Sequence, residues 1–435
     1  MEELEIQTAI ANFKSIKLNL PNGTENALYT FKFDEDFFPS YKIEKYLFTG
    51  LEDLGLTFSK DTLEITGYPM KSGTADFTLE FKILEEIEDA AFHSKEIKII
   101  LNPDPKLLWK NIPSDSEAIF WKEDNTAAAG KIGDRTIVVV SKRGRSHQNV
   151  GSFRDDDFAF QDFSDSGWGV VAVSDGAGSA ALSREGSRVA CNTIIAYFKE
   201  VILPNRELQD FEDSYLHFLD TKDETAFNDA KNEIKKSFYK GTLHVHNQLN
   251  ALAKDTAAKY PEIFSAKKVK YLAESFHATL IFTAFKKIKD TYVIITFSVG
   301  DCPIGVVSKD ESAATLLNWL DVGEFGGGTR FITQPDIFHS KERPMASRFN
   351  IHIQEDFSFL FLMSDGIYDP KFEVEVNLEK TEKWNDFIAD LKGKNEADVQ
   401  LNFNADETHI AEDLSKWMDF WSKGNHDDRT LAIIY

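Results

Sequence analysis

Four apolar, strand-like segments meet an aspartate at one end, and this pattern constrains the chain more than any other feature. Three of them run into an acidic turn: Trp168–Ser174 into Asp175-Gly176, Tyr292–Val299 into Gly300-Asp301, and Phe357–Ser364 into Asp365-Gly366. The order is reversed at the last segment, where Asp427-Asp428 precede Arg429–Tyr435. Because neighbouring antiparallel strands begin and end beside each other, we expect these carboxylates to gather at one edge of a sheet.

Clustered carboxylates repel each other and take up protons unless cations neutralise them. Oxygen ligands without thiolates or several imidazoles favour Mg²⁺ or Mn²⁺ over zinc or copper. A single Asp-Gly is usually a turn, but three of them at the ends of apolar strands favour a metal site. The run Asp155-Asp156-Asp157 precedes the first of these strands; it is either a solvated loop or part of the same site.

The charge balance excludes several classes of partner. Asp and Glu number 72 against 49 Lys and Arg, which gives a formal net charge of -23. Nucleic acids and anionic membranes need a basic surface, so we expect neither as a partner. The two cysteines, Cys191 and Cys302, have no zinc-site spacing. Without a leader pattern or an apolar run of about 20 residues, we expect a cytoplasmic protein.

The chain is expected to divide into two domains joined by a linker. Alternation in Ala27–Phe33, Asp76–Ile83 and Glu96–Leu101 predicts strands, and their turn-and-strand rhythm resembles immunoglobulin-like modules. We therefore assign residues 1–103 to a small immunoglobulin-like β-sandwich, 104–130 to a structured linker, and 131–435 to a domain of strands and helices. The spacing of apolar residues predicts helices over Arg184–Lys199 and Ala226–Ala258.

The motifs of the larger domain occur in a recognisable order. They are SH(147)…G(151)…DDDF(155–158), VVAVSDGAGSA(170–180), FHATL(276–280), SVGD(298–301), LMSDGIYD(362–369) and DDRTLAII(427–434). Each is weak alone. Together, from about Lys131 to Tyr435, they resemble the metal-dependent serine/threonine protein phosphatases, the PPM or type 2C family, in its bacterial branch.

The resemblance implies an α+β fold, a type 2C phosphatase-like α/β/β/α sandwich of two antiparallel sheets flanked by helices, preceded here by the small all-β domain. It implies hydrolysis of phosphoserine and phosphothreonine by a hydroxide shared between two Mn²⁺ or Mg²⁺ ions, with a third, looser ion. By this resemblance, Asp175 matches the aspartate that the first two metals share, and the Gly176 carbonyl matches a backbone ligand to one of them. Asp365 and Asp427 match further ligands of the first metal, and Asp155 and Asp156 match the contacts of the second. Asp301 and Asp369, with Asp365, match the position of the third.

Two positions depart from the family pattern. Gly151 stands where eukaryotic members have a phosphate-binding arginine, and Ala177 stands where they have a histidine proposed as general acid. Arg154, His147 or Arg143 could take the phosphate, and His147 or a metal-bound water could protonate the leaving group. We take His147 and Arg154 as the catalytic candidates. The departures also leave an alternative: a phosphatase-fold sensor or scaffold that binds a phosphorylated partner without turnover.

Three features remain open at this stage. Gly323–Gly328, followed by Arg330, is either a phosphate cradle or a surface connection. The segment from Ala226 to Ser275 is either a substrate-selecting flap or a structural insertion. The stretch Leu107–Asp115 resembles phosphatases encoded beside a kinase and a von Willebrand A protein in bacteria. We therefore expect a phosphorylated protein as substrate, with such proteins as partners.

Overall fold

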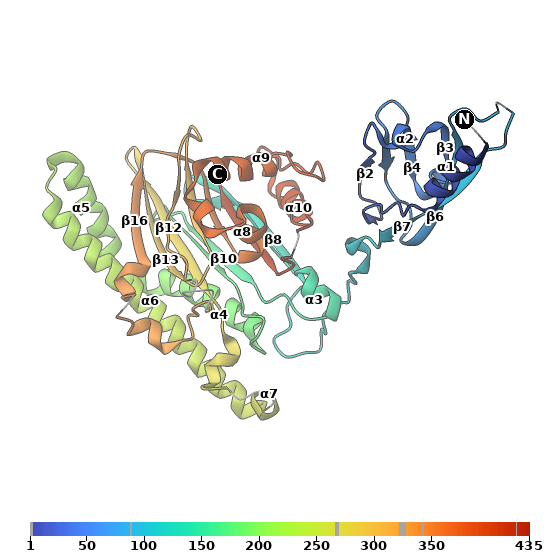
Figure 1. The fold of residues 1–435 in the computed structure, drawn as a ribbon. Helices are drawn as coiled ribbons and strands as arrows, with labels where there is room; N and C mark the ends of the chain where they lie inside the picture. Colours follow the sequence, from blue (N-terminus) through green and yellow to red (C-terminus); the bar gives the residue numbers. More distant parts are fainter. Residues whose placement is uncertain (1–2, 88, 266–268, 322–327, 342, 423) are drawn as a thin grey trace. The chain divides into compact units, whose positions relative to one another are not determined.

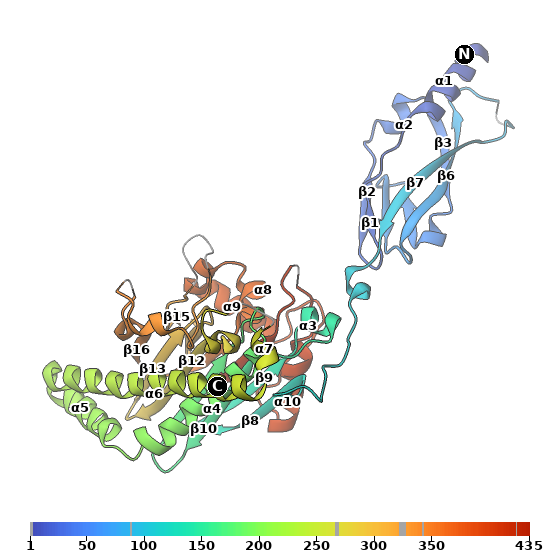
Figure 2. The ribbon, with the colours of Figure 1, turned by 90° about the horizontal axis from the view of Figure 1, so that it is seen from below.

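The computed structural model describes residues 3–87, 89–265, 269–321, 328–341, 343–422 and 424–435. The chain divides into two compact units, Met1–Lys110 and Asn111–Tyr435. Each unit is traced in Figure 1 and, from a second direction, in Figure 2. No described helix combines the length and the apolar character that crossing a membrane requires.

The first unit is built on two small sheets. A four-stranded sheet has the order β1-β7-β6-β3 and a three-stranded sheet the order β2-β5-β4. The strands are β1 (Gly23–Thr24), β2 (Tyr29–Lys32), β3 (Ile43–Thr49), β4 (Leu56–Ser59), β5 (Glu64–Gly67), β6 (Gly73–Ile83) and β7 (His93–Asn102). The three strands predicted in this region are confirmed as β2, β6 and β7. Their alternating side chains enter one core, as the regular in-and-out burial of β7 shows.

The described part of the first unit also contains two α-helices, α1 (Glu3–Ser15) and the short α2 (Phe37–Ser40). Helix α1 was not predicted from the sequence, although Ile10 and Phe13 repeat at helical spacing and both are buried in the common core. Lys95 of β7 donates hydrogen bonds to the carbonyls of Phe13 and Lys14 at 2.9 Å each, and thereby satisfies groups that the helix end leaves free.

The second unit contains two antiparallel sheets, of five and six strands. The first has the order β10-β11-β12-β13-β16 and the second β15-β14-β17-β18-β9-β8. The strands of the first are β10 (Asp157–Phe163), β11 (Trp168–Ser174), β12 (Leu280–Ile288), β13 (Thr291–Val299) and β16 (Phe349–Gln354). Those of the second are β8 (Asn125–Ile132), β9 (Arg135–Lys142), β14 (Ile304–Ser308), β15 (Ala314–Leu316), β17 (Phe357–Met363) and β18 (Arg429–Ile434).

Helices cover both outer faces of this pair of sheets (Figure 1). The helices of the second unit are α3 (Arg145–Val150), α4 (Ser183–Tyr197), α5 (Glu207–Thr221), α6 (Glu224–Lys259), α7 (Pro261–Ser265), α8 (Asp365–Phe372), α9 (Thr381–Leu391) and α10 (Glu407–Trp417). The helices α4 and α6 share a core with the five-stranded sheet, and α9 and α10 share one with the six-stranded sheet. Val139, Val171 and Leu360 belong to a third core, formed by strands of both sheets. The predicted α/β/β/α sandwich, preceded by an all-β region, is confirmed.

The helices predicted from periodicity are present as α4 and α6, while α5 was not predicted. Phe238, Val245 and Leu249 of α6 are fully buried in the core of the five-stranded sheet. The described part of this helix is therefore a layer of the fold, which favours the structural alternative over a flap.

The segment 104–130, taken from the sequence as a linker, is divided by the structure. Asn125–Gly130 belongs to β8, because these residues pair with β9 in register from Asn125 opposite Lys142. Asn111–Asp124 belongs to the second compact unit. Alanines and a glycine interrupt the apolar alternation of β8, so the pattern alone did not reveal the strand.

Candidate metal centre

The strand topology explains why the acidic turns converge. The strand β12 lies antiparallel between β11 and β13, so both of these end at the same end of their sheet, at Asp175 and Asp301. In the other sheet, β17 ends beside the start of β18, which places Asp365 near Asp427. From the sequence pattern, the carboxylates were expected to meet at one edge of a single sheet. The structure instead divides the strands between two packed sheets, and the carboxylates meet at the shared end of the sandwich.

The electrostatics of the carboxylates show that they form one cluster. Burial raises the pKa of Asp175 well above its usual range, and the nearby charges of Asp365 and Asp156 raise it further. The pKa of Asp365 is likewise raised well above its usual range by burial, then by Asp427 and Asp301. Desolvated like charges at close range favour protonation, so the cluster needs cations to remain fully ionised.

The turn after β11 is fixed by backbone contacts. The Asp175 N–H donates to the Thr279 hydroxyl at 2.8 Å, and the Thr279 N–H donates to the Asp175 carbonyl at 2.8 Å. A side chain at Gly176 would approach the Asp155 carbonyl to 2.6 Å. Glycine at this position therefore lets the acidic loop Arg154–Asp157 pack directly against the Asp-Gly turn.

Asp301 and Asp369 are held by neutral donors. Thr329 donates to Asp301 Oδ2 at 2.6 Å, and Asn425 donates to Asp369 Oδ2 at 3.2 Å. Asp301 Oδ1 is buried and has no hydrogen-bond partner among the described residues. A buried acceptor without a donor is costly, and a cation ligated at this oxygen would satisfy it.

Cys302 lies next to these carboxylates, which the sequence analysis did not anticipate. One ligand atom each from Asp175, Asp301 and Cys302 lies within 4.8 Å of the others. Burial raises the pKa of the Cys302 thiol well above its usual range, and the charges of Asp175 and Asp301 act in the same direction. Burial and the nearby charges therefore favour the protonated thiol, and the hard donors of this group are the carboxylate oxygens.

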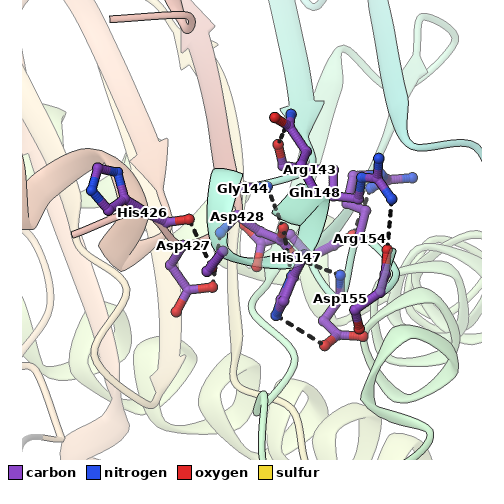
Figure 3. Close-up of polar contacts among 12 residues, drawn as sticks. Arg143, Gly144, His147, Gln148, Arg154, Asp155, His426, Asp427 and Asp428 are labelled. Atoms are coloured by element: carbon purple, nitrogen blue, oxygen red, sulfur yellow. Dashed lines mark hydrogen bonds and ion pairs between the residues drawn. The ribbon is translucent and has the colours of Figure 1, made fainter. Parts of the chain in front are cut away.

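Asp428 organises the other side of the cluster (Figure 3). Its Oδ1 accepts hydrogen bonds from the Gly144 N–H at 2.6 Å and from His147 Nδ1 at 2.9 Å, and its Oδ2 accepts one from the Asp155 N–H. His147 Nε2 lies 3.9 Å from Asp155 Oδ2. From the sequence, only Asp427 of the Asp427-Asp428 pair was predicted to belong to the site. The missed residue joins α3, the acidic loop and the start of β18.

The ionisation of this group follows from its contacts. Burial alone would lower the pKa of His147, but the hydrogen bond to Asp428 and the charges of Asp428 and Asp155 raise it to about 9. Burial and the charge of Asp428 raise the pKa of Asp155 to about 7. The same two causes raise the pKa of Asp156 to about 7, against the hydrogen bond from Thr430. The contacts of His147 with Asp428 and Asp155 therefore favour its protonated form.

The guanidinium groups of Arg154 and Arg143 are buried and form hydrogen bonds within the fold. Arg154 is 2% exposed, and its guanidinium donates to Ser141 Oγ at 2.7 Å and to the Asp156 carbonyl at 2.6 Å. Arg143 is 3% exposed and donates to the Ser152 carbonyl at 2.7 Å. Neither side chain presents a donor group to a substrate in this conformation. Of the three phosphate-binding candidates, only His147 has a nitrogen directed at the acidic cluster.

The predicted site residues are thus gathered at one end of the sandwich, with Arg154 beneath the acidic loop. Residues 323–327 of the glycine-rich segment considered as a phosphate cradle lie outside the described residues. The donor set fits hard divalent cations such as Mg²⁺ or Mn²⁺: clustered carboxylates of raised pKa and one orphaned carboxylate oxygen.

The comparison with known families agrees with this geometry. The family model for protein phosphatase 2C matches residues 143–419, which is more than half of the chain. The chain belongs to the protein phosphatase 2C family. Members of this family generally use Mn²⁺ or Mg²⁺, in keeping with the acidic cluster. No curated protein matches the chain by sequence.

Several solved structures are similar to the chain. A bacterial serine phosphatase shares 13% identity at a TM-score of 0.36, with 68% of this chain and 96% of that chain covered. Stp1, a serine/threonine phosphatase from Staphylococcus aureus, shares 13% identity at a TM-score of 0.37, covering 72% and 98%. RsbX in complex with magnesium shares 13% identity at a TM-score of 0.36, covering 71% and 98%. At these scores the family membership rests on the sequence match.

Proposed function

We propose that the chain is a metal-dependent protein serine/threonine phosphatase that hydrolyses phosphoserine and phosphothreonine in a partner protein. The observation that carries the proposal is the cluster of buried carboxylates, whose charges mutually raise their pKa values at one end of a phosphatase 2C fold. A phosphatase-fold scaffold without turnover would not need to keep this costly arrangement of like charges.

The ligand assignments follow the family pattern. Asp175 would bridge two cations, with Asp365, Asp427 and the Gly176 carbonyl completing the first site and Asp155 and Asp156 the second. Asp301 and Asp369 would hold a third, looser cation. When bound, divalent cations lower the pKa of a shared water and offset the charge of the phosphoryl group.

The remaining groups act on the substrate and on the shape of the pocket. Asp428 accepts a hydrogen bond from Nδ1 of His147, and this contact orients the imidazole so that Nε2 faces the acidic cluster. In that orientation Nε2 can donate to a phosphoryl oxygen and give its proton to the leaving serine or threonine oxygen. We therefore assign to His147 the roles that the family's arginine and histidine have in eukaryotic members.

The first unit has a separate role in this proposal. Its two small sheets suit an immunoglobulin-like docking module, and every carboxylate of the cluster belongs to the second unit. The expected partners are a phosphorylated protein substrate and, from the sequence resemblance, a kinase or a von Willebrand A protein.

A hydrolysis assay tests the proposed function. The 435-residue chain should hydrolyse p-nitrophenyl phosphate and a phosphothreonine peptide in the presence of Mn²⁺ or Mg²⁺. This hydrolysis should stop when EDTA removes the ion. Asp175→Asn should abolish turnover, because it removes the charge shared between two cations, whereas Asp255→Asn on the exposed face of α6 should not. His147→Gln should retain Mn²⁺ binding and lower kcat. Hydrolysis that persists after thorough chelation would refute the metal-dependent mechanism, and phosphopeptide binding without turnover would support the scaffold alternative.

A further inference from the structure

A segment at the start of the second unit is tied to the acidic loop of the metal centre. This segment, Asn111–Asp124, is called the strap below. It has no regular secondary structure and directly follows the last residue of the first unit, Lys110. Its partners lie mainly between Arg143 and Asp157, the stretch that carries His147, Asp155 and Asp156.

Backbone and side-chain hydrogen bonds join the two segments along their length. Arg143 donates to the side chain of Asn111 at 3.0 Å and to the Ile112 carbonyl at 2.8 Å. The Ile112 N–H donates to the Gln148 carbonyl at 2.9 Å. At the other end of the strap, Arg154 donates to the Glu123 carbonyl at 3.1 Å.

Lys122 makes the deepest of these contacts. The residue is 9% exposed, and its ammonium donates to the Asp156 carbonyl at 2.7 Å, to Asp157 Oδ2 at 2.8 Å and to Ser187 Oγ at 3.3 Å. Ser187 Oγ donates in turn to the Asp155 carbonyl. All three hydrogens of the ammonium are thus used, and they link the strap, the acidic loop and α4 at one point.

The position of this ammonium matters because the loop carries three successive aspartates. Asp157 forms an ion pair with Lys122 through Oδ2, and Arg154 lies 3.7 Å from its other oxygen. Asp155 and Asp156 keep their carboxylates for the cluster, where burial and Asp428 raise the pKa of each. Lys122 and Arg154 thus hold the backbone of the loop and Asp157, while the carboxylates of Asp155 and Asp156 remain available to ligate a cation.

We propose that Lys122 is a positioning residue for the metal centre: by anchoring the Asp156 carbonyl and Asp157, it holds Asp155 and Asp156 where they can ligate a cation. This inference deepens the proposed function and rests on it. Groups that orient metal ligands typically change metal affinity by 10–100-fold when they are removed. Lys122 acts through the loop, so its loss should weaken metal binding more than it changes the chemistry at saturating metal.

The test measures Mn²⁺ binding to the full-length protein, with free Mn²⁺ detected by electron paramagnetic resonance. Lys122→Met keeps an unbranched side chain that is one heavy atom shorter, and it removes the three hydrogen bonds. It should weaken Mn²⁺ binding at least about tenfold. Turnover of p-nitrophenyl phosphate should recover as Mn²⁺ is raised, with KM near the wild-type value. Lys131→Met, at an exposed position in β8, is the matched control and should bind Mn²⁺ like the wild type.

A second variant guards against misfolding of the first. Asp157→Asn removes the carboxylate partner of Lys122 without touching a proposed ligand, and it should weaken Mn²⁺ binding in the same direction. The double variant should bind Mn²⁺ no more weakly than Lys122→Met alone, because both changes break one interaction.

The outcomes separate this inference from the proposed function. A cooperatively folding Lys122→Met with Mn²⁺ affinity within about twofold of the wild type would overturn the positioning role, since the expected loss is about tenfold or more. If Lys122→Met does not fold, unchanged Mn²⁺ affinity in Asp157→Asn would overturn it equally. A wild-type protein that binds no Mn²⁺ would refute the proposed function, and the inference with it. Mn²⁺ binding that depends on Lys122 but gives no hydrolysis would refute only the enzymatic proposal.

Discussion

Asp428 should stabilise the second unit as well as shape its metal centre. Its carboxylate is 2% exposed and accepts three hydrogen bonds, from Gly144, His147 and Asp155. Burial alone would raise the pKa of Asp428, but these hydrogen bonds and the charge of His147 hold it below the usual value. The folded state is therefore built around the ionised form.

The expected loss in the free energy of unfolding on substitution of Asp428 follows from the hydrogen bonds that each of its two carboxylate oxygens accepts. In Asp428→Asn the amide oxygen can replace Oδ1 and keep two donors, but the amide NH₂ then faces the Asp155 N–H. One hydrogen bond to a charged group is lost, which is worth about 1.5–3 kcal/mol. Relief of repulsion with Asp155, Asp156 and Asp427 offsets part of this loss. We expect a net loss of about 2 kcal/mol in the free energy of unfolding, and about 3–5 kcal/mol for Asp428→Ala, which leaves all three donors unpaired.

Urea unfolding of the metal-free protein, followed by tryptophan fluorescence, measures this loss. Of the seven Trp residues, only Trp109 precedes the second unit, so the signal reports chiefly on the unit that contains Asp428. Asp255→Asn, at an exposed position in α6, should change the free energy of unfolding by less than about 0.5 kcal/mol. If Asp428→Asn is as stable as this control, repulsion among the carboxylates offsets the whole hydrogen-bond network, and the organising role of Asp428 would be refuted.

Three further predictions concern other parts of the chain. Asp301→Asn and Asp369→Asn should leave measurable hydrolysis with a higher Mn²⁺ requirement, since both are assigned to the looser third cation; complete loss in both would contradict that assignment. Deletion of residues 1–103 should leave p-nitrophenyl phosphate hydrolysis within a few-fold of the intact protein while weakening action on the cognate phosphoprotein, provided that melting of the truncated protein is cooperative. In the first unit, burial raises the pKa of Glu86, but the hydrogen bonds from His93 and from the Ile83 N–H leave it below the usual value. A pKa that is lower in the folded state stabilises the folded protein above the unfolded pKa of about 4.3, and this stabilisation is lost as the pH falls through the folded pKa. Glu86→Gln should therefore lower the unfolding midpoint of the first unit near neutral pH. Below about pH 4 the midpoints of the variant and the wild type should converge, as circular dichroism can show.

The sequence alone identified the acidic turns because the signal for them is local. An apolar run such as Phe357–Met363 specifies a buried strand, and the Asp-Gly that follows specifies where the strand stops. The same reasoning predicted β11, β13 and β18 nearly to the residue, and the order of the motifs indicated the family. Local periodicity also predicted α4 and α6. It carried a signal for α1, where Ile10 and Phe13 repeat at helical spacing, but that signal was not used.

The tertiary structure alone decided how these local elements serve one site. Whether β11 and β17 share a sheet depends on pairing between distant strands, and no local pattern states that pairing. The role of Asp428 depends on a hydrogen bond to Gly144, which lies 284 positions away in the chain. Arg154, next to the pair Asp155-Asp156, was predicted from the sequence to bind phosphate, but packing buries its guanidinium beneath the loop. Lys122 belongs to the segment 104–130 that was assigned to a linker, and nothing in its sequence context pointed to the site. Only folding buries its ammonium against Asp157 and places it beneath the acidic loop.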